Sequence, residues 1–281
     1  MFTIGLSTKE KNITEELFYQ YHKAGIEAAE IATSMEVWKE LDLKEIAAWA
    51  RRYGIRLWSA HLPYYSVYDR VDISSADRQY REKLLACFYD FMGRSCEAGI
   101  DKFVVHPSTE PIGEQERAEK IKLAQDSLFR LTEKAAQYGV SMAAENLPRS
   151  CLGRSAEEMR QLLEAHPRLR MCCDVNHLQH EDIGGFIRKF PDKIITVHIS
   201  DQDFIDERHW LPGEGASDWD SIYRSLEEIG YQGVWMYEVA FTCPNTIIRD
   251  RDLTCADFVR NAHEIFAGQK PTVIGVRKEN R

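Results

Sequence analysis

The feature that most constrains the fold of this 281-residue chain is a regular alternation of short apolar segments with longer amphipathic segments. The short segments are rich in β-branched residues, as strands are, and the long segments carry apolar residues at helical spacing. Strands that alternate with helices form a parallel sheet, because each return to a parallel strand needs a crossover connection. Eight strands are predicted, over residues 2–6, 26–31, 55–60, 102–105, 140–144, 169–173, 194–199 and 233–239.

Helices are predicted in the intervening segments, among them 14–24, 41–53, 75–98, 114–138, 155–165 and 217–229. Thr14 and Ser155 precede acidic first turns, as N-cap residues do, and a glycine follows five of the helices. Eight strand–helix units predict an α/β protein with a single-domain (β/α)₈ TIM barrel over residues 1–268 and a C-terminal extension over 269–281. A doubly wound open sheet is the alternative.

The bulk properties fit one soluble enzyme-sized barrel, since such barrels run to about 250 residues. The formal net charge of −9 disfavours a nucleic acid partner, because phosphates are repelled at long range. No segment approaches the roughly 18 apolar residues of a membrane span, and the first residues predict a strand and no leader peptide. The seven scattered cysteines indicate reduced thiols, so we expect a cytoplasmic protein without a membrane partner.

Ionisable side chains stand where the predicted strands end. In a closed barrel these positions converge on one rim, where barrel enzymes build their sites. Imidazole and carboxylate together are ligands for divalent metals, and so many carboxylates in one cavity would be costly without a cation. Each residue alone has a structural explanation, but their combination predicts a metal site. The residues are His61, His106, Glu145, Asp174, His177, His198 and Glu238, with Glu207 and His209 in the loop after the seventh strand; Glu30 is noted only as the end of the second strand.

Two other residues near this rim are candidates for substrate binding. Tyr64 follows Pro63 in the loop after the third strand, so its ring faces either the substrate or the core. Arg149 follows the fifth strand and either holds a substrate phosphate or carboxylate or is solvated.

The order of these residues resembles the xylose-isomerase-like barrel superfamily, which includes sugar isomerases and epimerases, inosose dehydratase and the endonuclease IV family. The resemblance extends from the first strand to the last and includes the segments AENLPRS and HWLPGEG. By position and motif, it implies that four residues hold one divalent ion (Mn, Co, Mg, Fe or Zn). These are Glu145, Asp174, His198 and Glu238.

In the ketose 3-epimerases of that superfamily, the two glutamates lie on opposite faces of the sugar and pass the proton. The resemblance therefore implies catalytic roles for Glu145 and Glu238, and a substrate contact or supporting role for His177. A metal-chelated ketone or hydroxyl acidifies the neighbouring C–H and stabilises an enediolate. The leading hypothesis is a metal-dependent isomerase or epimerase of a small-molecule sugar or sugar-derived keto compound; dimeric and tetrameric relatives make a homo-oligomer an expectation to test.

A second hypothesis is a two- or three-metal phosphoester hydrolase of the endonuclease IV type. That family uses nine ligands, and this chain offers a counterpart for each, the additional ones being His61, His106, His177, Glu207 and His209. Glu207 departs from the family's Asp-x-His motif, which puts the third metal in doubt. A keto-inositol dehydratase uses the same enediolate chemistry, and a non-catalytic barrel that senses a sugar or metal is a further alternative.

Overall fold

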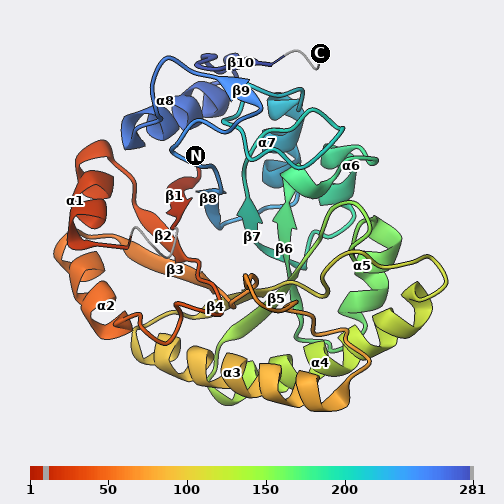
Figure 1. The fold of residues 1–281 in the computed structure, drawn as a ribbon. Helices are drawn as coiled ribbons and strands as arrows, with labels where there is room; N and C mark the ends of the chain where they lie inside the picture. The colour runs from red at the N-terminus through yellow and green to blue at the C-terminus, as the bar shows by residue number, and fades with distance from the viewer. Residues whose placement is uncertain (9–12, 279–281) are drawn as a thin grey trace.

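The computed structural model describes residues 1–8 and 13–278, and in it the predicted strands form a parallel barrel inside a ring of helices (Figure 1). Neighbouring strands follow in the order β7-β6-β5-β4-β3-β2-β1-β8. Backbone hydrogen bonds from Ile199 to Met236 and from Glu238 to Ile199 join β7 to β8 and close the barrel. The strands are β1 (Thr3–Ser7), β2 (Ala28–Ile31), β3 (Arg56–His61), β4 (Lys102–Val105), β5 (Ser141–Glu145), β6 (Arg170–Asp174), β7 (Ile194–His198) and β8 (Val234–Tyr237).

The helices begin and end where local sequence signals predict. Thr14 and Ser155 cap α1 and α5, and their side chains accept hydrogen bonds from the backbone N–H groups of Leu17 and Glu158. Gly25 ends α1 with a φ of 88°, a left-handed conformation that favours glycine. The helices are α1 (Glu15–Ala24), α2 (Leu43–Arg52), α3 (Arg78–Glu97), α4 (Arg117–Gln137), α5 (Ala156–Leu163), α6 (Ile183–Arg188), α7 (Trp219–Glu228) and α8 (Cys255–Phe266).

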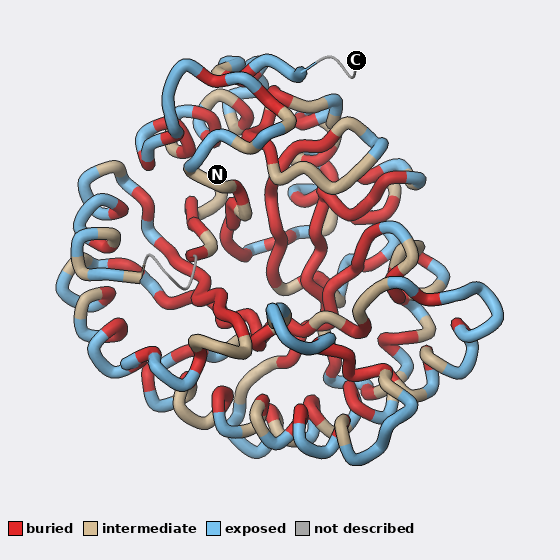
Figure 2. Tube along the Cα trace, viewed as in Figure 1, coloured by how far each residue is buried: buried red, intermediate tan, exposed pale blue. Residues whose placement is uncertain are grey.

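Side chains fill the barrel interior and leave its C-terminal end for polar groups. The strands and the inner faces of the helices are buried, whereas the outer faces are exposed (Figure 2). Trp58 of β3 donates a hydrogen bond across the interior to Thr196 of β7, over 3.2 Å. Gly5 of β1 makes room inside the barrel, because a Cβ there would lie 2.5 Å from Cγ1 of Val234. The fold is therefore a packed (β/α)₈ barrel, as predicted, and the alternative prediction of a doubly wound open sheet is wrong.

The chain beyond α8 returns to the barrel. Residues Val276–Arg277 form β10, which pairs antiparallel with β9 (Ile247–Ile248) in the loop before α8. Nε of Arg277 also donates to the backbone oxygen of Glu214, in the loop after β7. The described part of the predicted extension, up to residue 278, thus packs on the loops of the last two barrel units.

In the described part of the chain, no helix combines the length and apolar character needed to cross a membrane. All seven cysteines lie in that part and are unpaired thiols, four of them buried.

Candidate metal centre

The four predicted metal ligands meet at the C-terminal end of the barrel. Each offers an imidazole nitrogen or carboxylate oxygen, and these atoms all lie within 4.8 Å of one another. Nδ1 of His198 lies 3.1 Å from Oε1 of Glu145, 3.5 Å from Oε2 of Glu238 and 3.7 Å from Oδ2 of Asp174. The group combines three carboxylates with one histidine, a donor set that suits several divalent metals.

The two carboxylate oxygens of Asp174 have different environments. Oδ1 accepts a hydrogen bond from the backbone N–H of Asn176 and so caps the short 3₁₀ helix Val175–His177. Oδ2 is buried and has no hydrogen-bond partner within residues 1–8 and 13–278. A buried carboxylate oxygen without a partner is costly, and a bound cation would satisfy it. The residues present therefore fit a divalent metal ion at this position.

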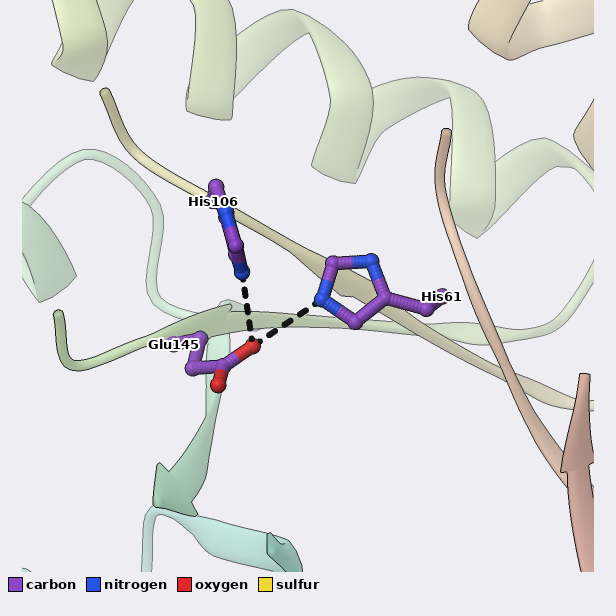
Figure 3. A group of neighbouring side chains, drawn as sticks. All are labelled: His61, His106 and Glu145. Carbon is purple, nitrogen blue, oxygen red and sulfur yellow. Dashed lines mark hydrogen bonds and ion pairs between the residues drawn. The ribbon is translucent and has the colours of Figure 1, made fainter. Parts of the chain in front are cut away.

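Glu145 also belongs to a second group of candidate ligands, drawn in Figure 3. Its Oε2 lies 3.0 Å from Nε2 of His61 and 3.3 Å from Nε2 of His106, whereas its Oε1 faces His198. The three side chains come from the ends of β3, β4 and β5, which are neighbours in the sheet. Glu145 thus faces His61 and His106 with one oxygen and His198 with the other, as a carboxylate that bridges two metal ions would.

A third group lies nearer the outside of the barrel mouth and consists of His177, Glu207 and His209. Oε1 of Glu207 lies 2.7 Å from Nε2 of His209 and 3.3 Å from Nε2 of His177. The longer glutamate, which departs from the family's aspartate, still brings one oxygen between the two rings. All nine residues predicted as ligands from strand ends and the following loop therefore fall into three groups, two of which share Glu145.

The two predicted catalytic glutamates differ in acidity. Burial alone would raise the pKa of Glu145, but the His198 and His106 rings beside it hold that pKa well below its usual value. Burial raises the pKa of Glu238 to about 7, against the lowering effect of His198 and His209. In the metal-free protein, Glu145 is thus a carboxylate at neutral pH, whereas Glu238 holds its proton more tightly than an ordinary glutamate does.

A cavity of about 300 Å³ opens beside Glu238. The side chain of Glu238 is 21% exposed, whereas those of Glu145, Asp174 and His198 are at most 1% exposed, so Glu238 is the ligand that a substrate would meet first. Tyr64 lines the cavity, with its ring centre 4.5 Å from that of His61. The lining residues are Ser7, Thr8, Ala32, Tyr64, Arg208, His209, Glu238, Val239 and Ala240.

Arg149 lies at the rim and is held by carboxylates. Its guanidinium pairs with Glu110, Asp206 and Glu207, which come from the loops after β4 and β7. An anionic substrate group would compete with these three carboxylates for Arg149. Arg149 therefore lies at the barrel mouth but does not line the cavity beside Glu238.

Two residues near the site had no predicted role. Arg208 lines the cavity, and its Nε donates to Oδ2 of Asp203 over 2.9 Å. Glu30, which was noted only as the end of a strand, is fully buried and contacts His198. A glutamate within the apolar run AAEIA is the signal that could have singled it out.

The fold and the three groups of ligands define a (β/α)₈ barrel with a candidate metal centre at its C-terminal mouth. Residues 18–251 match the family model described as xylose isomerase-like TIM barrel, and the chain belongs to that family.

Similar proteins of known sequence include the uncharacterized protein MJ1311 of Methanocaldococcus jannaschii, 26% identical over 195 residues, which are 65% of this chain and 64% of that protein. Fructoselysine 3-epimerase of Escherichia coli O157:H7 is 27% identical over 120 residues, 41% of this chain and 44% of the epimerase. The matches thus span less than two thirds of these relatives.

Solved structures share the fold over nearly the whole chain. A D-tagatose 3-epimerase-like protein superposes with a TM-score of 0.78 and 20% identity, covering 95% of this chain and 97% of that one. D-Psicose 3-epimerase from Clostridium cellulolyticum H10 superposes with a TM-score of 0.72 and 20% identity, covering 88% of this chain and 87% of that one.

Proposed function

We propose that this protein is a divalent-metal-dependent isomerase or epimerase of a sugar or sugar-derived keto compound. The observation that carries the proposal is the convergence of Glu145, Asp174, His198 and Glu238 beside a cavity of about 300 Å³. The names of fructoselysine 3-epimerase and of the 3-epimerases among the solved structures support a sugar substrate. The seven unpaired cysteines support a cytoplasmic location.

The four residues would hold one ion. That ion would give a partner to Oδ2 of Asp174, which is buried and has no hydrogen bond within the described residues. When bound, a divalent cation polarises a substrate oxygen and so acidifies the adjacent C–H group. Burial of the ligands keeps water away from this centre and strengthens every charge interaction within it.

Proton transfer is assigned to the two glutamates. In the metal-free protein, the low pKa of Glu145 favours the ionised form that a general base needs, and burial makes Glu238 a weaker acid, better suited to return a proton. A proton is removed from the carbon beside the carbonyl, leaving an enediolate, and is returned from the other glutamate. Return to the opposite face of the same carbon inverts it, which is an epimerisation.

Tyr64 is proposed to contact the substrate, because it lines the same cavity as Glu238 and its ring lies next to that of His61. Arg149 is proposed to act at the rim, where a substrate group that reached it would meet Glu110 and Asp206 as well.

The test is solvent deuterium exchange into a panel of keto-sugars, by protein loaded with Mn²⁺ or Co²⁺. Glu145→Gln and Glu238→Gln should each abolish exchange at the reacting carbon. Glu157→Gln, on the exposed face of α5, is the matched control and should exchange at the wild-type rate. Undiminished exchange in either active-site variant would contradict the assigned roles.

A second candidate function is hydrolysis of a phosphoester by two or three metal ions. It is favoured by one observation, that the two oxygens of Glu145 face separate groups of histidines, as a bridging carboxylate does in two-metal sites. Metal analysis of protein purified without chelator separates the two functions. About one ion per chain favours the epimerase, whereas two or three zinc ions with cleavage of abasic-site DNA or sugar phosphates favour the hydrolase.

A further inference from the structure

Glu30 is a buried carboxylate that the proposed proton transfer does not use. It lies in β2, and none of its surface is accessible to solvent. Its Oε1 accepts a hydrogen bond from the hydroxyl of Ser7 in β1 over 2.9 Å, and its Oε2 accepts one from the hydroxyl of Ser59 in β3 over 2.7 Å. The neighbouring strands therefore hold both oxygens in place.

The same carboxylate reaches across the barrel to His198 of β7. Nε2 of His198 lies 3.0 Å from Oε1 and 3.2 Å from Oε2 of Glu30. An ionised carboxylate can only accept, so Nε2 must carry the hydrogen. Nδ1 is the other ring nitrogen, and it faces Glu145, Asp174 and Glu238, so it is the nitrogen that would bind a metal ion there after losing its own proton.

Three other histidines at the mouth have the opposite arrangement. Nδ1 of His61, His177 and His209 lies 2.8 to 3.0 Å from the backbone oxygens of Leu62, Asn146 and Glu238, respectively. Each of these rings therefore presents Nε2 to the neighbouring carboxylates and has an uncharged partner behind it. His198 is different, since the partner behind it is a buried carboxylate.

A carboxylate behind a metal-binding histidine sets the tautomer, fixes the ring plane and makes the ligating nitrogen more basic. We infer that Glu30 is a positioning residue of the metal centre, which directs Nδ1 of His198 at the ion and adds a negative charge behind it. The inference rests on the proposed metal site, but it does not depend on which substrate the site takes.

The test compares Mn²⁺ affinity, measured by titration calorimetry at one pH, with the ring nitrogen of His198 that carries the proton in Zn²⁺-loaded protein, measured by ¹⁵N NMR. Glu30→Gln keeps an acceptor for Nε2–H and removes the charge, whereas Glu30→Ala removes both. Loss of such a partner typically weakens metal binding about 10- to 100-fold, so we expect that loss in Glu30→Ala and a smaller one in Glu30→Gln. The NMR spectrum should show the Nε2–H form of His198 in wild type and in Glu30→Gln, and a mixture of forms in Glu30→Ala.

The matched control is Glu27→Gln, an exposed glutamate one residue before β2, which should bind Mn²⁺ as tightly as wild type. If Glu30→Ala does not fold, Glu30→Gln decides the question by itself. Wild-type affinity in Glu30→Gln, or the Nδ1–H form in wild type, would overturn the inference. If the Glu30 variants bind Mn²⁺ more weakly but the wild-type protein epimerises no sugar, the positioning role of Glu30 is supported and the proposed function is refuted. The two hypotheses can therefore fail separately.

Discussion

A buried ion pair between the last two barrel loops provides a sharp test of the structure. Arg249, which follows β9, donates from Nε and Nη2 to the two carboxylate oxygens of Glu214, over 2.9 and 2.6 Å. Both side chains are 0% exposed. Glu214 also accepts a hydrogen bond from the backbone N–H of Leu211, so the pair anchors the loop that carries Glu207 and His209.

Replacing Arg249 by Met keeps most of the side-chain volume but leaves the carboxylate of Glu214 buried without its cation. Breaking a buried pair in this way costs about 3–5 kcal/mol in the free energy of unfolding. For a chain of 281 residues, the entropy of unfolding converts that loss into a fall in Tm of about 5–9 °C. The double variant Glu214→Gln with Arg249→Met should be more stable than Arg249→Met alone, because no unpaired charge remains.

The assay is thermal and urea unfolding followed by circular dichroism at pH 7. Arg224→Met is the matched control, because Arg224 pairs with Asp220 on the exposed face of α7. A surface pair contributes about 0.5 kcal/mol or less, so that variant should unfold close to wild type. A loss below about 1 kcal/mol in the free energy of unfolding of Arg249→Met would refute this reasoning, because it would mean that water or another group compensates the charge of Glu214.

Three further predictions concern the site and the barrel. Because neighbouring acidic groups, among them Glu30, Glu238 and Glu145, raise the pKa of His198 well above its usual value against the effect of its burial, metal must displace a proton from this proposed ligand at neutral pH. The rise in Tm caused by Mn²⁺ should therefore grow from pH 6 to pH 9, and a shift that is larger at pH 6 would contradict this. If wild-type protein binds more than one ion per chain, His61→Gln should lower the metal content measured by elemental mass spectrometry. An unchanged metal content in that case would exclude His61 as a ligand. Gly5→Ala should lower the free energy of unfolding by about 1–3 kcal/mol in urea, because its Cβ would overlap Val234; wild-type stability would show that the barrel interior can adjust.

Because folding raises the pKa of His198, its protonated form stabilises the metal-free protein fully below about pH 6.5, and this stabilisation is lost as the pH rises through the raised pKa. Metal binding replaces the lost protons with a cation, so its effect is largest where the protons have left.

Much of the fold could be predicted because its signals are local. Apolar runs, N-cap residues and terminal glycines act within a few residues, and the eight strands lie within two residues of their predicted starts and ends. The pairing of β10 with β9 was not predicted, since two-residue strands carry too little pattern to be recognised.

The sequence by itself determined which side chains reach the mouth, because parallel strands in a closed barrel all end on the same rim. Only the tertiary structure decided which atoms meet there: that Glu145 divides its two oxygens between two groups, that Arg149 is held by three carboxylates, and that Glu30 stands behind His198. The contact between Glu30 and His198 joins residues 168 positions apart. Such a contact depends on barrel closure and on side-chain rotamers, which no local pattern in the sequence contains.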